Sequence, residues 1–283
     1  MPEPAFAQAA LPLFEQGLVE VVEWSFDMGW GPQGEPGWLA SLVDEYASDG
    51  ALVGHGVSYS LLGVEGRHDL WLERLAAEVS RRRYRWISEH IGFVGAGRFS
   101  FSAPLPLPFS DEVMALGRRR LAEMAAVVSC PVGVENLATC LGVSDAERQG
   151  QLLEGLLAPV HGFMVLDLHN LWCQSMNTGI SCHDLLAALP VHRVRELHVS
   201  GGSWSQPSGS DRTIRRDTHD DVVPEQVHAL LALALTRCPN VEVVIYERLG
   251  HTLGAPEQQE AYRQDVRRVY EATRDVGATD DFP

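Results

Sequence analysis

Short runs of apolar residues alternate along this chain with longer stretches whose apolar residues recur at helical spacing. Some runs, such as Phe-Met-Val-Leu at 163–166 and Val-Val-Ile-Tyr at 243–246, are apolar throughout, which is typical of strands buried on both faces. Seven strands are expected, at residues 18–26, 51–56, 84–89, 131–135, 163–168, 194–199 and 241–247. Amphipathic helices are expected at 70–83, 111–129, 145–157, 183–189 and 224–237.

Repeated alternation of strand and helix predicts parallel strands joined by crossover helices. We expect an α/β fold, a (β/α)8 TIM barrel, in which residues 1–283 form a single domain. Such a barrel needs eight strands, and residues 5–14 at the N-terminus make an unconvincing one, so the first strand is expected to be degenerate. An open doubly wound sheet is the alternative, although no glycine-rich GxGxxG turn follows any of the strands.

Six successive strands of this pattern close on a histidine or an acidic residue. These residues are His55, His90, Glu135, Asp167, His198 and Glu247. The chain has 11 His and 38 acidic residues among 283, so chance gives such an ending about once in six strands. Because all strand ends of a parallel barrel open on one rim, the six side chains should converge on a site at the C-terminal rim.

The residue types of this set point to metal binding. A lone strand-end histidine is more often a hydrogen-bonded structural residue, and Asp167 alone could simply cap the next helix. Together, however, imidazoles and carboxylates suit iron, manganese or zinc, and six ligands exceed the four of a tetrahedral zinc ion. We therefore expect two or more ions. Asp217 and His219 add an Asp-x-His pair in a later loop.

A loop rich in glycine and serine, residues 201–209, follows the sixth strand and leads into several arginines. Arg212 and Arg215 are candidates for binding a carboxylate of the substrate, and a plain exposed loop is the alternative. Trp204 within this loop is unusual for a linker, and an aromatic tip on a flexible loop suggests a lid that contacts the substrate.

Composition excludes several classes of function. The formal net charge is −16, and every one of the 22 basic residues is arginine. The absence of lysine rules out a Schiff-base, pyridoxal-phosphate or phosphate-loop lysine. The acidic balance argues against nucleic acid or an anionic membrane as the main partner, since both need a basic surface.

The N-terminal segment and the cysteines predict a cytoplasmic protein. No lysine or arginine precedes Arg67, so the cationic start of a signal peptide is missing. Five cysteines form an odd set without a CxxC pair, which indicates reduced thiols, and no apolar run is long enough for a membrane span.

Ten short motifs in collinear order, from about residue 18 to 250, carry a resemblance to a known family. They are His-Gly-Val-Ser-Tyr-Ser-Leu at 55–61, Ser-Glu-His at 88–90, Pro-Leu-Pro-Phe at 106–109, Val-Glu-Asn at 134–136, Leu-Asp-Leu-His-Asn at 166–170, Asn-Thr-Gly at 177–179, Leu-His-Val-Ser-Gly at 197–201, Asp-Thr-His at 217–219, Val-Val-Pro at 222–224 and Tyr-Glu at 246–247. In these residues the chain resembles the multinuclear non-heme iron-dependent oxidases, the family of the methanobactin-biosynthesis oxidase.

The resemblance implies a barrel similar to the xylose-isomerase group, with two or three irons of mixed Fe(II)/Fe(III) state at its C-terminal rim. It implies an enzyme that uses O2 to oxidise a ribosomally made precursor peptide, typically at cysteine, with a separate leader-binding protein as a plausible partner. One iron would take Glu135, Asp167, His198 and Glu247. A second would take His55, His90 and a bridging Glu135, and a third would take Asn170, Asp217 and His219.

The chain departs from the family pattern at two places. Members commonly have Ala-Gly-His where this chain has Ser-Gly-Gly at 200–202, and an Asn-Asn pair where it has His169 and Asn170. These differences bear on the substrate more than on the metal.

Three other functions compete with the oxidase. A divalent-metal sugar isomerase or epimerase of the same barrel type would use two carboxylates and two histidines around Mn or Mg, often with a lysine that this chain lacks. A tri-zinc phosphodiesterase resembling endonuclease IV would need a DNA-binding surface, against which the net charge of −16 counts. A non-enzymatic metal-bearing scaffold fits an open rim of ligands least well.

Overall fold

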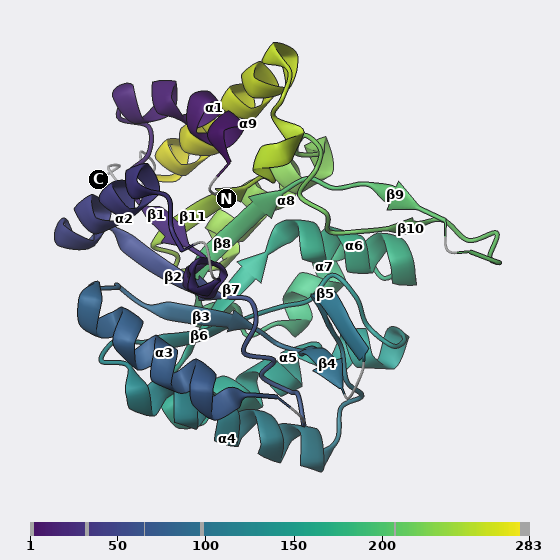
Figure 1. Ribbon diagram of the computed structural model, residues 1–283. Coiled ribbons are helices and arrows are strands. Elements are labelled where there is room, and N and C mark those ends of the chain that lie inside the picture. The colour runs from purple at the N-terminus through teal and green to yellow at the C-terminus, as the bar shows by residue number, and fades with distance from the viewer. Residues whose placement is uncertain (1–2, 32–33, 65, 97–98, 207, 278–283) are drawn as a thin grey trace, which may run out of the picture.

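A parallel sheet curls into an almost closed barrel at the centre of the computed structural model (Figure 1). The structure describes residues 3–277, except 32–33, 65, 97–98 and 207. The strands of this sheet, in order across it, are β1 (Val22–Trp24), β2 (Leu52–Gly56), β3 (Ile87–His90), β6 (Val132–Glu135), β7 (Phe163–Asp167), β8 (Val194–Ser200) and β11 (Val243–Glu247). Their order in space follows the chain without a reversal, which excludes the doubly wound alternative.

The strands confirm the expected pattern, with one marked shortening at the N-terminus. The first expected strand, 18–26, is reduced to the three residues of β1, which pair with β2. Residues 5–14 fall in helix α1 (Pro4–Glu15), not in a strand. The described part of the sheet therefore has seven strands. Strands β1 and β11 stand at its two ends and do not pair with each other. This is the arrangement expected of a TIM barrel whose first strand is degenerate.

Helices cover the outer face of the sheet (Figure 1). They are α2 (Gly37–Ser48), α3 (His68–Arg81), α4 (Asp111–Val127), α5 (Val143–Leu157), α6 (Leu168–Thr178), α7 (Cys182–Ala188), α8 (Glu225–Arg237) and α9 (Pro256–Gly277). The five helices expected from the sequence correspond to α3, α4, α5, α7 and α8 within a few residues. Helix α1 packs against α9 beside β11, where Leu13 and Tyr262 are buried together.

The interior of the barrel is filled with side chains. A buried cluster there contains Val53, Trp86, Phe163, Val165, Val243 and Ile245. The rings of Trp86 and Phe163 lie 5.5 Å apart, and Gly133 leaves the space that the Phe163 ring occupies. The barrel is thus a packed core and not a pore, and only its rim is available to a ligand.

Two hairpins extend the loops that follow the strands. One joins β4 (Phe93–Ala96) to β5 (Phe99–Leu105), and the other joins β9 (Trp204–Ser205) to β10 (Ile214–Arg215). The second hairpin, described at residues 203–206 and 208–216, projects from the barrel beside α6 and is called the arm below (Figure 1). Within the described ranges, no helix combines the length and apolarity needed to cross a membrane.

Helix α5 approaches the end of α7 so closely that Gly150 has no room for a side chain. A Cβ at Gly150 would overlap the carbonyl oxygen of Ala188. We expect Gly150→Ala to lower the free energy of unfolding by about 1–3 kcal/mol, because overpacking outweighs the gain in helix propensity. Gly37→Ala at the start of α2, where a Cβ meets open space, should instead raise it by ~0.4–1 kcal/mol. Urea unfolding compares the two, and equal effects would contradict the close packing.

Candidate metal centre

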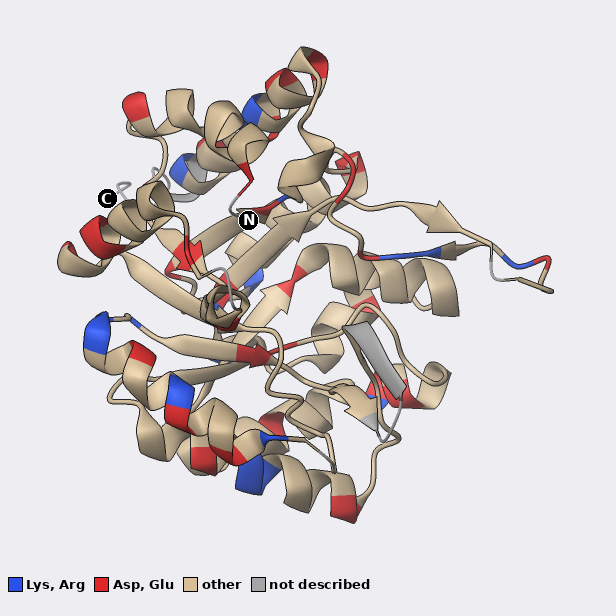
Figure 2. Cartoon of the chain, viewed as in Figure 1, with Lys and Arg blue, Asp and Glu red and all other residues tan. Residues whose placement is uncertain are grey.

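The carboxyl ends of six strands meet at one mouth of the barrel. There the structure brings together the six side chains predicted from the strand ends, with acidic residues in the mouth as well as on the outer helices (Figure 2). The ring centroids of His55 and His90 lie 4.6 Å apart, and those of His55 and His198 lie 5.5 Å apart.

One oxygen atom of Glu135 is the meeting point of three imidazoles. Glu135 Oε2 lies 3.1 Å from His55 Nε2, 3.3 Å from His90 Nε2 and 3.8 Å from His198 Nδ1. His55, His90 and Glu135 each present a ligand atom within 4.8 Å of the others, and we call them the inner group. A carboxylate placed between imidazoles in this way offers a cation one oxygen and two nitrogens.

A second set of ligand atoms shares Glu135 with the inner group. Glu135, Asp167 and His198 meet within 4.8 Å and form the middle group. Glu247 Oε2 adds a further carboxylate 3.3 Å from His198 Nδ1. The sharing of Glu135 is the arrangement in which one carboxylate can bridge two ions.

A third set lies toward the open side of the mouth. Asp167, Asp217 and His219 meet within 4.8 Å and form the outer group. His219 Nε2 lies 2.9 Å from Asp217 Oδ1 and 3.7 Å from Glu247 Oε2. His219 has a φ of +50°, an uncommon backbone conformation for a residue with a side chain, of the kind that concentrates at functional sites.

Asn170 joins the middle of the site from the first turn of α6. Its Nδ2 donates to Glu135 Oε1 at 3.1 Å and to the carbonyl of Asn136 at 3.0 Å, while its Oδ1 has no hydrogen-bond partner. Asp167 caps the same helix, because its Oδ1 accepts from the backbone N–H of Asn170 at 2.5 Å. The cap leaves Asp167 Oδ2 facing the site.

Several buried polar atoms here lack a hydrogen-bond partner among the described residues. They are Glu135 Oε2, Asp167 Oδ2, Asn170 Oδ1, His90 Nδ1 and both ring nitrogens of His198. Buried polar atoms are normally paired, so a cluster of unpaired oxygens and imidazole nitrogens calls for cations. The residues present therefore fit metal ions that accept mixed oxygen and nitrogen ligands.

Electrostatics in the mouth reflect charges held close together. Burial raises the pKa of Asp167 well above its usual value, and the neighbouring carboxylates of Asp217 and Glu135 raise it further. Burial disfavours the charged form of His55, yet the charges of Glu23 and Glu135 raise its pKa to about 10. Protons on imidazoles thus balance the carboxylates in the metal-free chain, and a bound cation would take over that role.

Neighbouring polar side chains orient the candidate ligands. His55 Nδ1 lies 2.8 Å from Ser88 Oγ, which leaves Nε2 directed at Glu135. Asn136 donates to the carbonyl of Asp167 at 3.1 Å and accepts from its backbone N–H at 2.8 Å. The Ser88 contact thus orients the His55 ring, and the Asn136 pair fixes the backbone of Asp167, before any metal binds.

Two buried glutamates that sequence reasoning missed lie just below the rim. His198 Nε2 lies 3.1 Å from Glu23 Oε2 and 3.5 Å from Glu196 Oε1. Glu196 also accepts from Trp86 Nε1 at 2.7 Å. The signal that could have found Glu196 is its place two residues before His198 on one strand, which puts both side chains on the same face. Glu23 belongs to the three-residue β1 and had no such signal.

The arm carries the three residues predicted to contact a substrate. Trp204 is half exposed, and Arg212 donates to the carbonyl of Asn177. Arg215 differs, because it is buried between the rings of Trp172 and Trp204 at 4.6 and 5.6 Å and is bonded within the protein.

Comparison with protein families gives a decisive match. Residues 31–262 match the family described as RiPP precursor modification enzyme MbnB/TglH/ChrH, where RiPP denotes a ribosomally synthesised and post-translationally modified peptide. The chain belongs to this family.

Two curated relatives are each named UPF0276 protein. The one from Caulobacter vibrioides is 29% identical over 242 residues, 85% of this chain and 81% of its own, and the one from Neisseria meningitidis serogroup B is 26% identical over 75% and 74%.

Solved structures similar to this chain share its fold at low sequence identity. A xylose isomerase domain protein from Planctomyces limnophilus has a TM-score of 0.56 at 14% identity and covers 84% of each chain. D-psicose 3-epimerase from Clostridium cellulolyticum H10, solved with D-tagatose, has a TM-score of 0.55 at 10% identity, covering 98% of this chain and 94% of its own. These likenesses confirm the xylose-isomerase-like TIM barrel.

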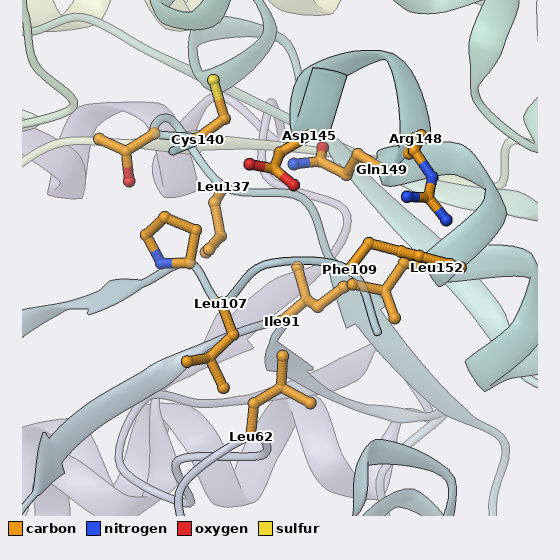
Figure 3. Close-up of a pocket in the computed structure, with 12 residues that line it drawn as sticks. Leu62, Ile91, Leu107, Phe109, Leu137, Cys140, Asp145, Arg148, Gln149 and Leu152 are labelled. Atoms are coloured by element: carbon orange, nitrogen blue, oxygen red, sulfur yellow. The ribbon is translucent and has the colours of Figure 1, made fainter. Parts of the chain in front are cut away.

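A largely apolar hollow, open in part to solvent, adjoins the rim of the barrel (Figure 3). Leu62, Ile91, Leu107 and Leu137 line it, with Arg148 at its edge. Ile91 directly follows β3, and Leu137 lies just beyond the end of β6, so the hollow lies beside the strand ends of the inner group.

Removing the charge of Asp167, which two ligand groups share, should affect the stability of the chain and its metal binding in opposite directions. Asp167→Asn keeps an oxygen to cap α6 but removes a carboxylate whose ionisation burial opposes. We expect the metal-free variant to unfold with a free energy about 1 kcal/mol higher than wild type at pH 7. The gain should shrink as pH falls toward the ordinary Asp pKa of about 4, because Asp167 is then protonated in the unfolded wild-type chain as well as in the folded one.

The same variant should bind fewer metal ions than wild type, because the middle and outer groups share Asp167. Thermal unfolding in chelator and metal counting by dialysis measure the two effects. Asp211→Asn, an exposed charge removal on the arm, is the matched control and should change neither. A less stable metal-free Asp167→Asn would contradict the proposed charge repulsion.

Proposed function

We propose that this chain is a multinuclear non-heme iron oxidase that uses O2 to modify a ribosomally made precursor peptide, with cysteine as the modified residue. The observation that carries the proposal is the set of three ligand groups linked by the shared carboxylates of Glu135 and Asp167, in a chain of the RiPP modification family. The candidate ligands are His55, His90, Glu135, Asp167, Asn170, His198, Asp217, His219 and Glu247.

The donor set suits iron. Imidazole and carboxylate ligands are those of non-heme iron sites, and a carboxylate shared between neighbouring ions helps hold Fe(II) beside Fe(III). We expect two or three ions in this mixed state. Iron held there would supply the electrons that reduce O2.

The exposure of the ligands indicates the side from which substrate approaches. The side chains of His55, Glu135 and His198 are at most 3% exposed, whereas those of His219 and Asp217 are 24% and 20% exposed. Glu135 and its contacts with His55 and His198 are therefore shielded from water, whereas the His90 side chain is 19% exposed. The outer group includes the most exposed of these ligands, His219, so a peptide reaches the centre over the outer group. The arm lies next to the outer group, since its Arg215 contacts His169, which in turn contacts Asp217. Trp204 and Arg212 of the arm are therefore our candidates for contact with the peptide. Arg215, the third residue that the sequence predicts to contact substrate, is buried, which favours a supporting role.

The sugar isomerase or epimerase is the second candidate function, favoured by the fold of the solved structures. Such an enzyme needs two carboxylates and two histidines around one Mn or Mg ion, whereas the candidate ligands at this mouth include four carboxylates and four histidines. The chain also contains no lysine to assist at a carbonyl group. A tri-zinc phosphodiesterase fits poorly with a net charge of −16.

We also propose that a separate protein delivers the leader part of the precursor, because the acidic chain has little to attract an acidic leader. Five free cysteines, two of them buried with raised thiol pKa values, fit the reducing cytoplasm.

Metal analysis tests the proposal directly. The chain, produced with iron and purified without O2, should hold two or three irons and take up O2 when its cognate peptide is added. Glu135→Gln should lower both iron content and O2 uptake, the latter by roughly 100-fold or more, because two groups share this carboxylate. Exposed Glu15→Gln on α1 is the matched control and should behave as wild type.

Other metals would point to the rival functions. Zinc without iron would support a hydrolase, and Mn or Mg without O2 uptake would support an isomerase or epimerase. Either result would overturn the oxidase.

Substrate contact by the arm gives a separate prediction. Arg212→Gln should raise the KM for the peptide about tenfold, the cost of one charge-assisted hydrogen bond, with iron content unchanged. Arg237→Gln, an exposed arginine in the last turn of α8, is the control. Steady-state kinetics measure the effect, and equal KM values would exclude Arg212 from the peptide site.

A further inference from the structure

His169 is buried beside the outer group without being a candidate ligand. It lies in the first turn of α6, two residues after Asp167, and is fully shielded from solvent. Its Nδ1 lies 3.0 Å from Asp217 Oδ1, and its Nε2 lies 3.3 Å from Nε and 3.2 Å from Nη2 of Arg215.

These contacts determine which ring nitrogen carries the proton. A guanidinium group can only donate hydrogen bonds, so His169 Nε2 must accept from Arg215. The neutral ring then carries its hydrogen on Nδ1 and donates it to the carboxylate of Asp217. Both ring nitrogens are thereby engaged, and neither is available to a metal ion.

Arg215 is itself held firmly in place. Its guanidinium lies between the rings of Trp172 on α6 and Trp204 on the arm. Its backbone N–H donates to Asn177 Oδ1 at 2.9 Å, and its carbonyl accepts from Asn177 Nδ2 at 2.9 Å. The arm is thus fastened to α6 by a pair of amide hydrogen bonds and a buried cation between aromatic rings.

The loop after β8 is shaped around the His169 ring. A Cβ at Gly202 would come within 2.8 Å of His169 Cε1 and would overlap the carbonyl oxygen of Arg216. Only glycine fits beside the imidazole at this position. Asp217 follows in the same region, on a loop and not on a strand, so its carboxylate depends on such neighbours for its orientation.

We propose that His169 is a positioning residue, oriented by Arg215, which holds the Asp217 carboxylate in the outer group for metal binding. The inference rests on the proposed function only in that Asp167, Asp217 and His219 bind a metal ion. Arg215 belongs to the arm and contacts Trp204, so the proposed role of His169 also makes metal binding by the outer group depend on how the arm packs against α6. Outer hydrogen bonds of this kind typically alter metal affinity by about 10–100-fold.

Titration of the metal-free full chain with Mn²⁺, counting bound ions by equilibrium dialysis, tests the proposal without any catalytic assay. His219→Ala identifies the binding step that belongs to the outer group, and His55→Ala identifies the step of the inner group. His169→Leu should weaken the outer step by about 10–100-fold and leave the inner step unchanged.

A conservative variant separates positioning from packing. His169→Asn should stay within about threefold of wild type, because its Nδ2 takes the place of the imidazole Nδ1 and still donates to Asp217. The melting temperatures of the metal-free His169→Asn and His169→Leu chains report on packing alone. Rescue by Asn and loss with Leu support the proposal, and equal losses in both variants would overturn it.

The remaining outcomes are also decisive. Unchanged Mn²⁺ binding by His169→Leu, with a normal wild-type titration, would overturn the positioning role alone. A wild-type chain that binds no Mn²⁺ would overturn the metal centre and this inference together. If His169→Leu does not fold, Arg215→Met tests the contact between Arg215 and His169. This variant should weaken Mn²⁺ binding by the outer group severalfold. Unchanged Mn²⁺ binding would overturn the proposal.

Discussion

The structure depends on one buried contact, the approach of three imidazoles to a single oxygen of Glu135. His55, His90 and His198 come from three different strands, and their nitrogens lie 3.1 to 3.8 Å from that atom. Such a cluster cannot be dry and stable unless positive charge balances its carboxylates, whether as protons or as metal ions. Strand register sets the positions of the three imidazoles, and Ser88 orients the ring of His55.

The sequence predicts those features of the fold and the site that depend on a local pattern of residues, and not those that depend on contacts between distant segments. Strands buried on both faces have a local signature, so their positions and their terminal His, Asp and Glu residues were predictable. The reduction of the first strand to β1 was only partly visible, because residues 18–26 are apolar enough for a longer strand. Whether that segment pairs over three residues or nine depends on contacts with β2 and α1, which no local pattern encodes.

The supporting residues were harder to foresee than the candidate ligands. Glu196 lies on the same strand as His198, but an acidic residue in mid-strand gives no sign of its partner, and only the closure of the barrel brings Glu23 of β1 to His198. His169 stood next to predicted ligands, but its direction depended on where β7 ended and α6 began. Arg215 looked like a substrate contact because sequence cannot reveal that two tryptophans from distant segments enclose it.

The unpaired ends of the sheet have a consequence for the chain as a whole. No backbone ladder among the described residues joins β1 to β11, so side chains must close the seam between them. His198 contributes to this closure, since its Nε2 meets Glu23 of β1 while its Nδ1 faces Glu247 of β11. The imidazole of His198 therefore links the two end strands of the sheet and is also one of the candidate metal ligands. By thermodynamic linkage, a cation that bound His198 Nδ1 in the closed barrel would also stabilise the seam, and opening the seam would weaken the binding of that cation.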